Sequence, residues 1–269
     1  MDIWQALILG IVEGITEYLP VSSTGHLLVT QRLLGIEATA AANAYAIAIQ
    51  AGAIVAVIGL YWSRCLQMLQ GVLGRDRAGL ELLGRLIVAF LPAAVLGLLF
   101  DDAIEARLFG PWPIVAAWTA GGILILALPR RFMAGGSGDM MSMAWSAALV
   151  IGLAQCAALW PGTSRSLATI LGGLVAGLSL ASAVEFSFLL GLLTLGAATS
   201  YKALDEGAGM LNEFGVAAIA VGFAAAWISA VLAVRWMVGW LQRRGLRLFG
   251  WWRLAAALCV ALLILTGTL

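Results

Sequence analysis

The chain has 269 residues, of which 62% are hydrophobic and only 11% are charged, and its net charge is +1. A soluble domain carries about 25% charged residues, so lipid must cover much of this surface. The charge balance gives no indication of nucleic-acid binding, and we expect an all-α polytopic membrane protein.

Eight apolar blocks follow one another along the chain. Two of them, 3–36 and 143–178, are broken by proline and polar residues. The other six are uninterrupted, and we expect each to form a transmembrane helix, since apolar runs of about 18 residues or more are typical of membrane spans. These six are residues 44–62, 86–100, 111–128, 183–201, 214–234 and 250–269.

The linkers between the blocks alternate in charge. Three are basic, and basic linkers face the cytoplasm; they contain Arg64, Arg75, Arg77 and Arg85, then Arg130 and Arg131, then Arg235, Arg243, Arg244, Arg247 and Arg253. Two are acidic and are expected outside, with Asp101, Asp102 and Glu105 in one and Asp205, Glu206 and Glu213 in the other. Block 143–178 then enters from the cytoplasm and returns to it, as a re-entrant helical hairpin.

The two broken blocks resemble each other. Residues 6–13 align with 148–155, and after a one-residue gap 20–23 align with 161–164. Each block is followed by three spans, which gives the two hairpins opposite orientations and places 3–36 as a hairpin entering from outside. The prediction is one membrane domain with an inverted-topology repeat, 1–130 and 143–269, and a site near the midplane where broken helices line a polar cavity.

Two carboxylates lie in the first broken block. Glu13 and Glu17 are four residues apart, so they share a helix face and repel each other at a depth where each charge is costly. A divalent cation, Mg²⁺ or Ca²⁺, would relieve both problems, because carboxylates are its usual ligands. Neutralisation by Arg165, or protonation, is the alternative.

A polar turn follows the carboxylates. Pro20 ends the first helix, and Ser22, Ser23, Thr24 and Gly25 form a turn that begins a second one. The free N–H groups of such a helix start favour an anion, although Ser is also a common N-cap. One hydroxyl can cap the helix while another contacts a ligand.

His26 is the only histidine in the chain. Its ordinary pKa suits proton transfer near neutral pH. A lone histidine is usually structural, but the position of His26, just past the serine turn, favours a functional role.

The second broken block carries a basic polar segment, 161–169. Arg165 needs an anionic partner inside the membrane, and its planar fork of donors suits a phosphate or one of the two glutamates. Gly162 allows close backbone approach, and Thr163, Ser164 and Thr169 add hydroxyl groups for a substrate. Carboxylates, serine, histidine and arginine in one cavity indicate metal-assisted phosphate chemistry.

These segments resemble the undecaprenyl-pyrophosphate phosphatase (bacitracin-resistance) family of bacteria. The resemblance covers the whole chain through E-G-I-T-E-Y-L-P-V-S-S-T-G-H-L at 13–27, A-I-Q-A-G-A-I at 48–54, G-L-A-Q at 152–155, P-G-T-S-R-S and A-T within 161–169, and E-F-S-F-L-L at 185–190. It implies hydrolysis of undecaprenyl diphosphate to undecaprenyl phosphate and inorganic phosphate, with a divalent metal, in the inner membrane. That reaction recycles the lipid carrier for the cell wall.

The resemblance also assigns roles to residues. It implies a metal-associated pair and then a polar set around the substrate: Glu13 and Glu17 for the metal, then Ser22, Ser23, His26, Ser164, Arg165 and Thr169. The chain departs from the family pattern at Leu167, where glycine is usual, and at 191–193, where a proline is usual. Leu167 would narrow the cavity beside Ser164 and change the range of substrates.

The expected mechanism has Ser23 as nucleophile, with Glu17 or His26 accepting its proton, while Arg165 and the turn N–H groups neutralise the phosphate. Direct attack by water is the alternative. The diphosphate is expected to enter from the outer, periplasmic side, with its tail among membrane lipids, and a homodimer is left open.

Two other functions are alternatives to hydrolysis by this mechanism. A polyprenyl-phosphate flippase or transporter would use the same inverted-repeat cavity. A two-histidine lipid phosphatase would need a second histidine, which the chain lacks.

Overall fold

The computed structural model describes residues 1–37, 39–133 and 135–269, and at a few positions inside helices it describes the backbone alone. The described ranges are helical apart from turns, short loops and two isolated β-bridges. The helices are α1 Ile3–Thr16, α2 Ser23–Leu33, α3 Ala40–Leu60, α4 Trp62–Val72, α5 Arg77–Leu108, α6 Pro111–Ala127, α7 Arg130–Met133, α8 Trp145–Gln155, η1 Cys156–Leu159, α9 Arg165–Val175, α10 Leu180–Arg244 and α11 Arg247–Leu265.

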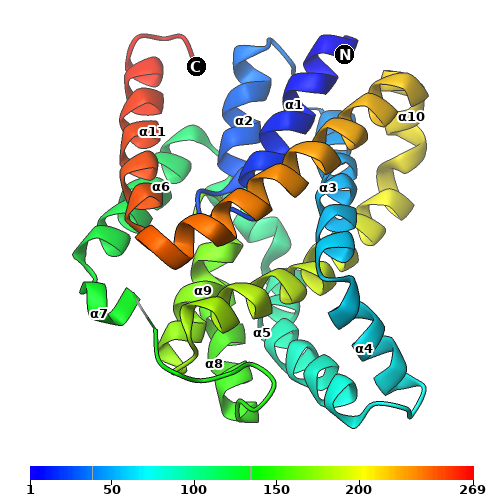
Figure 1. The fold of residues 1–269 in the computed structure, drawn as a ribbon. Helices are drawn as coiled ribbons and strands as arrows, with labels where there is room; N and C mark the ends of the chain where they lie inside the picture. Colours follow the sequence, from blue (N-terminus) through cyan, green and yellow to red (C-terminus); the bar gives the residue numbers. More distant parts are fainter. Residues whose placement is uncertain (38, 134) are drawn as a thin grey trace.

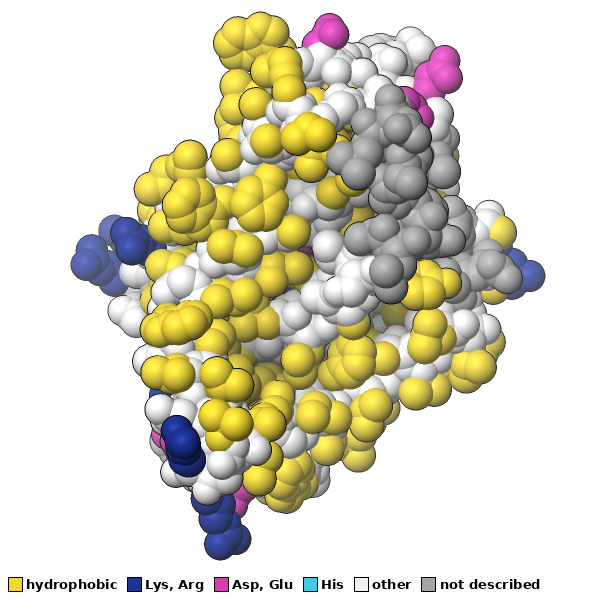
Figure 2. Space-filling model, turned by 90° about the vertical axis from the view of Figure 1, so that its right-hand side faces the viewer, with side chains coloured by type: hydrophobic (Ala, Val, Ile, Leu, Met, Phe, Trp, Pro, Cys, Tyr) yellow, Lys and Arg dark blue, Asp and Glu magenta, His cyan; other side chains and the backbone are white. Residues whose placement is uncertain are grey.

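Four helical segments of the described chain are long and apolar enough to cross a membrane: Arg77–Phe100, Leu180–Tyr201, Glu213–Arg244 and Arg247–Leu265. A fifth appears if Ala44–Leu60 and Trp62–Val72, which meet at 84°, are one span. Helix α6 covers the predicted span 111–128 but has 17 residues, and about 20 are needed. The prediction of a multi-pass, all-helical membrane protein is confirmed, whereas the count of six spans stays a prediction. Figure 2 shows apolar side chains over most of the described surface facing the viewer.

Helix α10 differs from the expected pattern. The sequence suggests a linker at 202–213, but the backbone stays helical through it and turns at Gly215, with φ of 73°. Glycine reaches this left-handed conformation without steric cost, and residues 180–214 contain no proline to end the helix earlier. The acidic side chains Asp101, Asp102, Glu105, Asp205 and Glu206 lie outside the described residues.

The two broken blocks form helix pairs that start from opposite ends of the molecule. In Figure 1, α1 begins at the top and runs down, while α8 begins near the bottom and runs up. Helices α2 and α9 have 11 residues each. Each begins after a left-handed serine, Ser22 or Ser164, and is followed by a left-handed glycine, Gly35 or Gly177. The serines and the glycines are separated by the same sequence distance, so the backbone pairs Ser22 with Ser164, where the gapped alignment paired Ser23 with Ser164.

Each helix pair packs against the other half of the chain. A Cβ on Gly10 or Gly14 would collide with the backbone of α10 at Gly222 or Ala226, and a Cβ on Gly152 would lie 2.6 Å from the carbonyl oxygen of Ala89 in α5. Small residues let membrane helices approach backbone to backbone. The contacts α1–α10 and α5–α8 therefore hold the two polar turns at the centre of the molecule.

Candidate active site

The turn after α1 and the start of α9 meet at an ion pair. Arg165 Nη2 donates to Glu17 Oε1 across 3.2 Å, with both side chains at least 90% buried. The expected meeting of the two polar segments, 148 residues apart, is thus found in the structure. The pairing also agrees with the alternative that Arg165 neutralises a glutamate.

The hydroxyl group of Ser23 is the best candidate for a nucleophile in this site. It is the first residue of α2, is buried, and donates its hydroxyl proton to Glu17 Oε2. Ser22, the N-cap residue, provides no side-chain cap, so the first N–H groups of α2 have no side-chain acceptor. A carboxylate in contact with a hydroxyl beside an uncapped helix start matches an activated nucleophile next to an anion site.

Arg165 is fixed by three further groups. Its Nη1 donates to the Ser187 carbonyl oxygen at 3.0 Å, and its guanidinium lies 5.4 Å from the ring centre of Tyr18. Gly191 makes the space, because a Cβ there would lie 2.5 Å from Arg165 Nη1. Gly191 is one of the positions where the sequence departs from the family pattern, and here the small residue has a packing reason.

The hydroxyls of the second segment bond mainly to the protein. Ser164 Oγ caps α9 by accepting from the Leu167 N–H at 3.3 Å, and it lies 3.0 Å from Ser166 Oγ. Ser166 in turn donates to the Leu19 carbonyl oxygen in the first turn at 3.0 Å. Thr169 Oγ lies 2.6 Å from Ser187 Oγ. These bonds lock the two turns together.

Thr24 and Thr163 do not join this network. Thr24 is exposed and Thr163 partly buried, and neither side chain hydrogen-bonds to a described residue. Gly162, with φ of 97°, lies where a Cβ would be 2.9 Å from Ala117 Cβ in α6, so the close approach expected for it is to a helix. Leu167 is buried in the apolar core.

Glu13 offers the best candidate position for a cation. Its side chain is fully buried and neither carboxylate oxygen has a hydrogen-bond partner, which is costly for a polar group unless a ligand binds it. The Glu17 N–H donates to the Glu13 carbonyl oxygen at 2.9 Å, so helical geometry continues and both carboxylates share a face. The described residues contain no cluster of three or more acidic, histidine or cysteine groups. Mg²⁺ is usually bound by one or two carboxylates, and oxygens of the substrate phosphate complete its coordination shell. Glu13 and Glu17 therefore fit the ion.

His26 uses both ring nitrogens for structure. The indole N–H of Trp252, which can only donate, donates to His26 Nε2 at 3.0 Å. The proton of this neutral ring is thereby assigned to Nδ1, which donates to the Ser22 carbonyl oxygen at 2.7 Å. The ring also packs 4.6 Å from that of Trp118. Of the two expected proton acceptors, only Glu17 contacts Ser23.

Arg253 is a site residue that the sequence analysis placed wrongly, among the basic cytoplasmic residues. It is fully buried, and its Nη atoms donate to carbonyl oxygens of both turns and of α6: Pro20 at 3.4 Å, Thr163 at 3.1 Å, Gly162 at 2.9 Å and Ala117 at 2.8 Å. The sequence did contain a sign of this buried position, because Arg253 is the one charged residue after Arg247 and lies in an apolar segment. Arg85, also counted as a linker charge, is buried as well and donates to the Met141 carbonyl oxygen.

Comparison with known proteins points to one family. The sequence profile described as bacitracin resistance protein BacA matches residues 6–259. The chain is 45% identical over 256 residues to the undecaprenyl-diphosphatase of Sorangium cellulosum, covering 94% of this chain and 83% of that one. It is similar to undecaprenyl-diphosphatase 2 of Rhodospirillum rubrum, at 45% over 95% of this chain and 93% of the relative. It is 44% identical to the undecaprenyl-diphosphatase of Ectopseudomonas mendocina, and the alignment covers 97% of this chain and 94% of the relative.

Proposed function

The chain belongs to the bacitracin resistance protein BacA family, and we propose that it hydrolyses undecaprenyl diphosphate to undecaprenyl phosphate and inorganic phosphate. The relatives reported above are named for this activity, and their similarity extends over almost the whole chain. The observation in the site that supports it best is the contact of Ser23 Oγ and Arg165 with the two oxygens of one buried carboxylate, Glu17. The reaction regenerates the lipid carrier for cell-wall synthesis and so underlies bacitracin resistance.

The proposed reaction has two steps. Ser23 Oγ attacks the terminal phosphorus and gives its proton to Glu17, while the bond from phosphorus to the bridging oxygen breaks and undecaprenyl phosphate leaves. Water then attacks the phosphoserine, the bond from phosphorus to Ser23 Oγ breaks, and inorganic phosphate is released as H2PO4⁻, which carries both protons of the water. Glu17 returns the proton to Ser23 Oγ. Arg165 stabilises the charge that develops on the phosphate oxygens.

The proposed cofactor is a divalent cation, Mg²⁺ or Ca²⁺, held by Glu13 and Glu17. When bound it would neutralise phosphate charge and help to orient the substrate. The unpartnered carboxylate of Glu13 supports this assignment. Ser22 and the N–H groups at the start of α2 would then hold phosphate oxygens, while Ser164, Thr169 and His26 keep the turns in place.

The proposed placement is the bacterial inner membrane, with the site open to the periplasmic side. The six-span arrangement with re-entrant hairpins 3–36 and 143–178, in repeats 1–130 and 143–269, is part of this proposal. It is supported by the opposite directions of α1 and α8 and by the matching left-handed serines at 22 and 164. A flippase function has no support among the relatives, which are named as diphosphatases.

Phosphate release from undecaprenyl diphosphate by purified Ser23→Ala protein tests the nucleophile. We expect a loss of about a thousandfold or more in kcat, as for other removed nucleophiles. Thr30→Ala is the matched control, because Thr30 lies about two turns further along α2 and its hydroxyl bonds to the His26 carbonyl oxygen. Normal turnover by Ser23→Ala would rule out the covalent route and leave direct attack by water.

Titration of activity with Mg²⁺ or Ca²⁺ after chelation tests the metal site. Wild-type activity should vanish with chelator and return with the cation. Glu13→Gln should require a higher cation concentration for half-maximal activity, because one of two carboxylate ligands is lost. An unchanged cation requirement in that variant would remove Glu13 from the metal site.

A further inference from the structure

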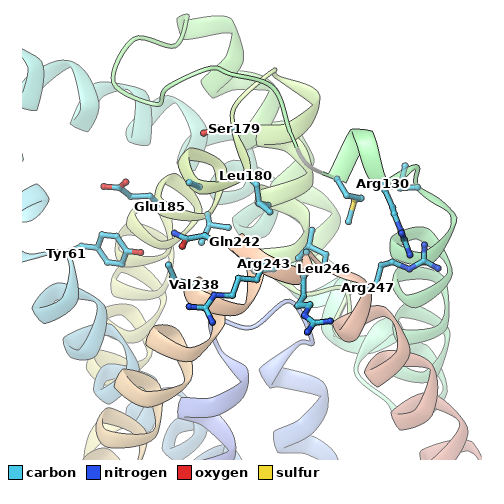
Figure 3. A pocket seen from close by; sticks show the side chains of 17 residues that line it. Tyr61, Arg130, Ser179, Leu180, Glu185, Val238, Gln242, Arg243, Leu246 and Arg247 are labelled. Atoms are coloured by element: carbon cyan, nitrogen blue, oxygen red, sulfur yellow. The ribbon is translucent and has the colours of Figure 1, made fainter.

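A cavity of about 810 Å³ lies apart from the catalytic residues, between the two ends of α10, α7 and the start of α11 (Figure 3). None of Glu13, Glu17, Ser23 or Arg165 lines it. Four arginines do, and they come from three helices: Arg130 of α7, Arg243 and Arg244 of α10, and Arg247 of α11. We call this space the arginine cavity.

The four guanidinium groups have no carboxylate partner among the described residues. The one acidic side chain of the lining, Glu185, is bound to Arg64 Nε at 2.8 Å and is thereby neutralised. The arginine cavity therefore carries a strong positive charge. The positive-inside rule explains why arginines lie on this side of a membrane protein, but not why they surround one hollow.

A helix end adds to the positive potential. Helix α11 starts at Arg247 directly after the lining residue Leu246, and it has no side-chain cap. Its first N–H groups therefore have no side-chain acceptor, and a negative charge near them is favourable. The start of α10, in contrast, is capped by Ser179, which accepts from the Ser182 N–H at 3.2 Å.

Much of the remaining wall of the arginine cavity is apolar, although Ser179 and Gln242 also line it. The apolar part includes Leu128, Met133, Val184, Val238 and Leu246. A small inorganic anion would leave these side chains uncovered, whereas a phosphate that carries hydrocarbon chains would contact both parts of the lining. The charge and the apolar wall together fit a lipid with an anionic head.

An aromatic layer separates this cavity from the catalytic residues. Tyr61 lines the arginine cavity, and its ring centre lies 5.9 Å from that of Phe188. Phe188 packs at 5.3 Å against Tyr18, which lies beside Arg165. A ligand in the arginine cavity would not touch the diphosphate held at Glu17 and Arg165.

We propose that the arginine cavity binds the phosphate headgroup of an anionic phospholipid, with its chains against the apolar wall. Basic pockets between membrane helices on the cytoplasmic side suit such headgroups. In Figure 3, Arg130 and Arg247 lie at one end of the lining, Arg243 lies near Val238 in its middle, and Tyr61 and Glu185 lie at the other end. The proposal does not depend on the hydrolytic reaction.

Native mass spectrometry of the purified full chain, in neutral detergent with phosphatidylglycerol, tests it without substrate. We expect retained lipid in the wild type and a rise in unfolding temperature with added lipid. In Arg243→Gln/Arg247→Gln the apparent affinity should fall by about tenfold or more, since each basic residue near an anionic lipid contributes about 1 kcal/mol. Arg75→Gln/Arg77→Gln, which removes equal charge from two exposed residues before and at the start of α5, should bind like wild type.

Three outcomes would overturn the proposal. One is equal lipid retention in both double variants. Another is equal retention of zwitterionic phosphatidylcholine by the wild type. The third is a temperature rise with inorganic phosphate alone that equals the rise with lipid, which would make this a free-phosphate site. If the glutamine variant does not fold, Arg243→Lys/Arg247→Lys keeps the charge and should retain the lipid more weakly than wild type but above the background of phosphatidylcholine.

Discussion

Two buried charges at the centre of the molecule have different kinds of surroundings. Glu13 has no hydrogen-bond donor, whereas Arg253 is surrounded by four carbonyl oxygens and no carboxylate. Burying a charge without an opposite partner is costly, so each must serve something other than stability alone. Arg253 holds the backbones of both turns in one position, and Glu13 is the residue for which we propose a cation.

Replacement of Arg253 by glutamine should lower the unfolding temperature and kcat together. Several buried carbonyl oxygens would lose their donor, at about 1–3 kcal/mol for each one left unsatisfied. Thermal unfolding and phosphate release on the same preparation measure both effects. Arg235→Gln, an exposed arginine of α10, is the control and should change neither. A variant with wild-type unfolding and wild-type kcat would show that the two turns hold their positions without Arg253.

At the residue scale the sequence indicated that Arg165 needs an anionic partner, either a phosphate or one of the two glutamates, because charges in a membrane need partners. The structure shows that the glutamate is Glu17. It could not predict Arg253, since assignment of basic residues to linkers uses only their position along the chain. The use of His26 was also beyond reach. Its partner Trp252 is 226 residues away, and the hydrogen bond that fixes the tautomer depends on how α2 and α11 pack.

Helix α10 positions Arg165 through one glycine. Gly191 faces the guanidinium closely, while Gly196, further along the same helix, has no atom within 4 Å of the place where a Cβ would be. The two glycines therefore form a matched pair in the same helix. One is required by packing against a site residue and the other is not.

Gly191→Ala should reduce kcat sharply while Gly196→Ala keeps it. The new methyl group must displace Arg165 from Glu17 and from the Ser187 carbonyl oxygen. Gly196→Ala should raise stability slightly, because alanine favours a helix by about 1 kcal/mol over glycine. Steady-state phosphate release and thermal unfolding of both variants test this. Equal activity of the two variants would contradict the role given to Gly191.

At the element scale the broken helices were predictable, because proline and serine interrupt apolar sequence in both blocks. The continuity of α10 was not. Its middle carries acidic residues that indicate a loop between spans, yet a charged segment without proline can remain helical until a glycine such as Gly215 turns the chain. The bend of 84° between α3 and α4 was not predictable either, because no proline lies at this point of the sequence.

In the whole molecule, the first helix of each broken block packs on a helix far from it in the sequence. Helix α1 packs on the second part of α10, and α8 packs on α5. The charge pattern predicted opposite entry of the two helix pairs, and α1 and α8 do run in opposite directions in Figure 1. It could not predict which helix each pair would contact, because that depends on the position of small residues on facing helices.

Cysteine labelling tests the proposed orientation at this scale. In a background without Cys65, Cys156 and Cys259, Glu37→Cys should react with a membrane-impermeant reagent in cells with a permeable outer membrane. Ser137→Cys should react only after the inner membrane is opened. Both positions are exposed in loops next to the two helix pairs. Reaction of both cysteines from the same side would contradict the inverted repeat.

The packing of α1 on α10 also sets the order in which the protein can fold during synthesis. Ser229 donates to the Gly10 carbonyl oxygen across 219 residues of sequence, so α1 leaves the ribosome long before its packing partner exists. Glu17 lacks its partner Arg165 until α9 is translated, and α1 lacks its packing partner until the later part of α10 follows. Contacts between such distant residues form late. We therefore expect the nascent chain to gain activity only when translation is almost complete.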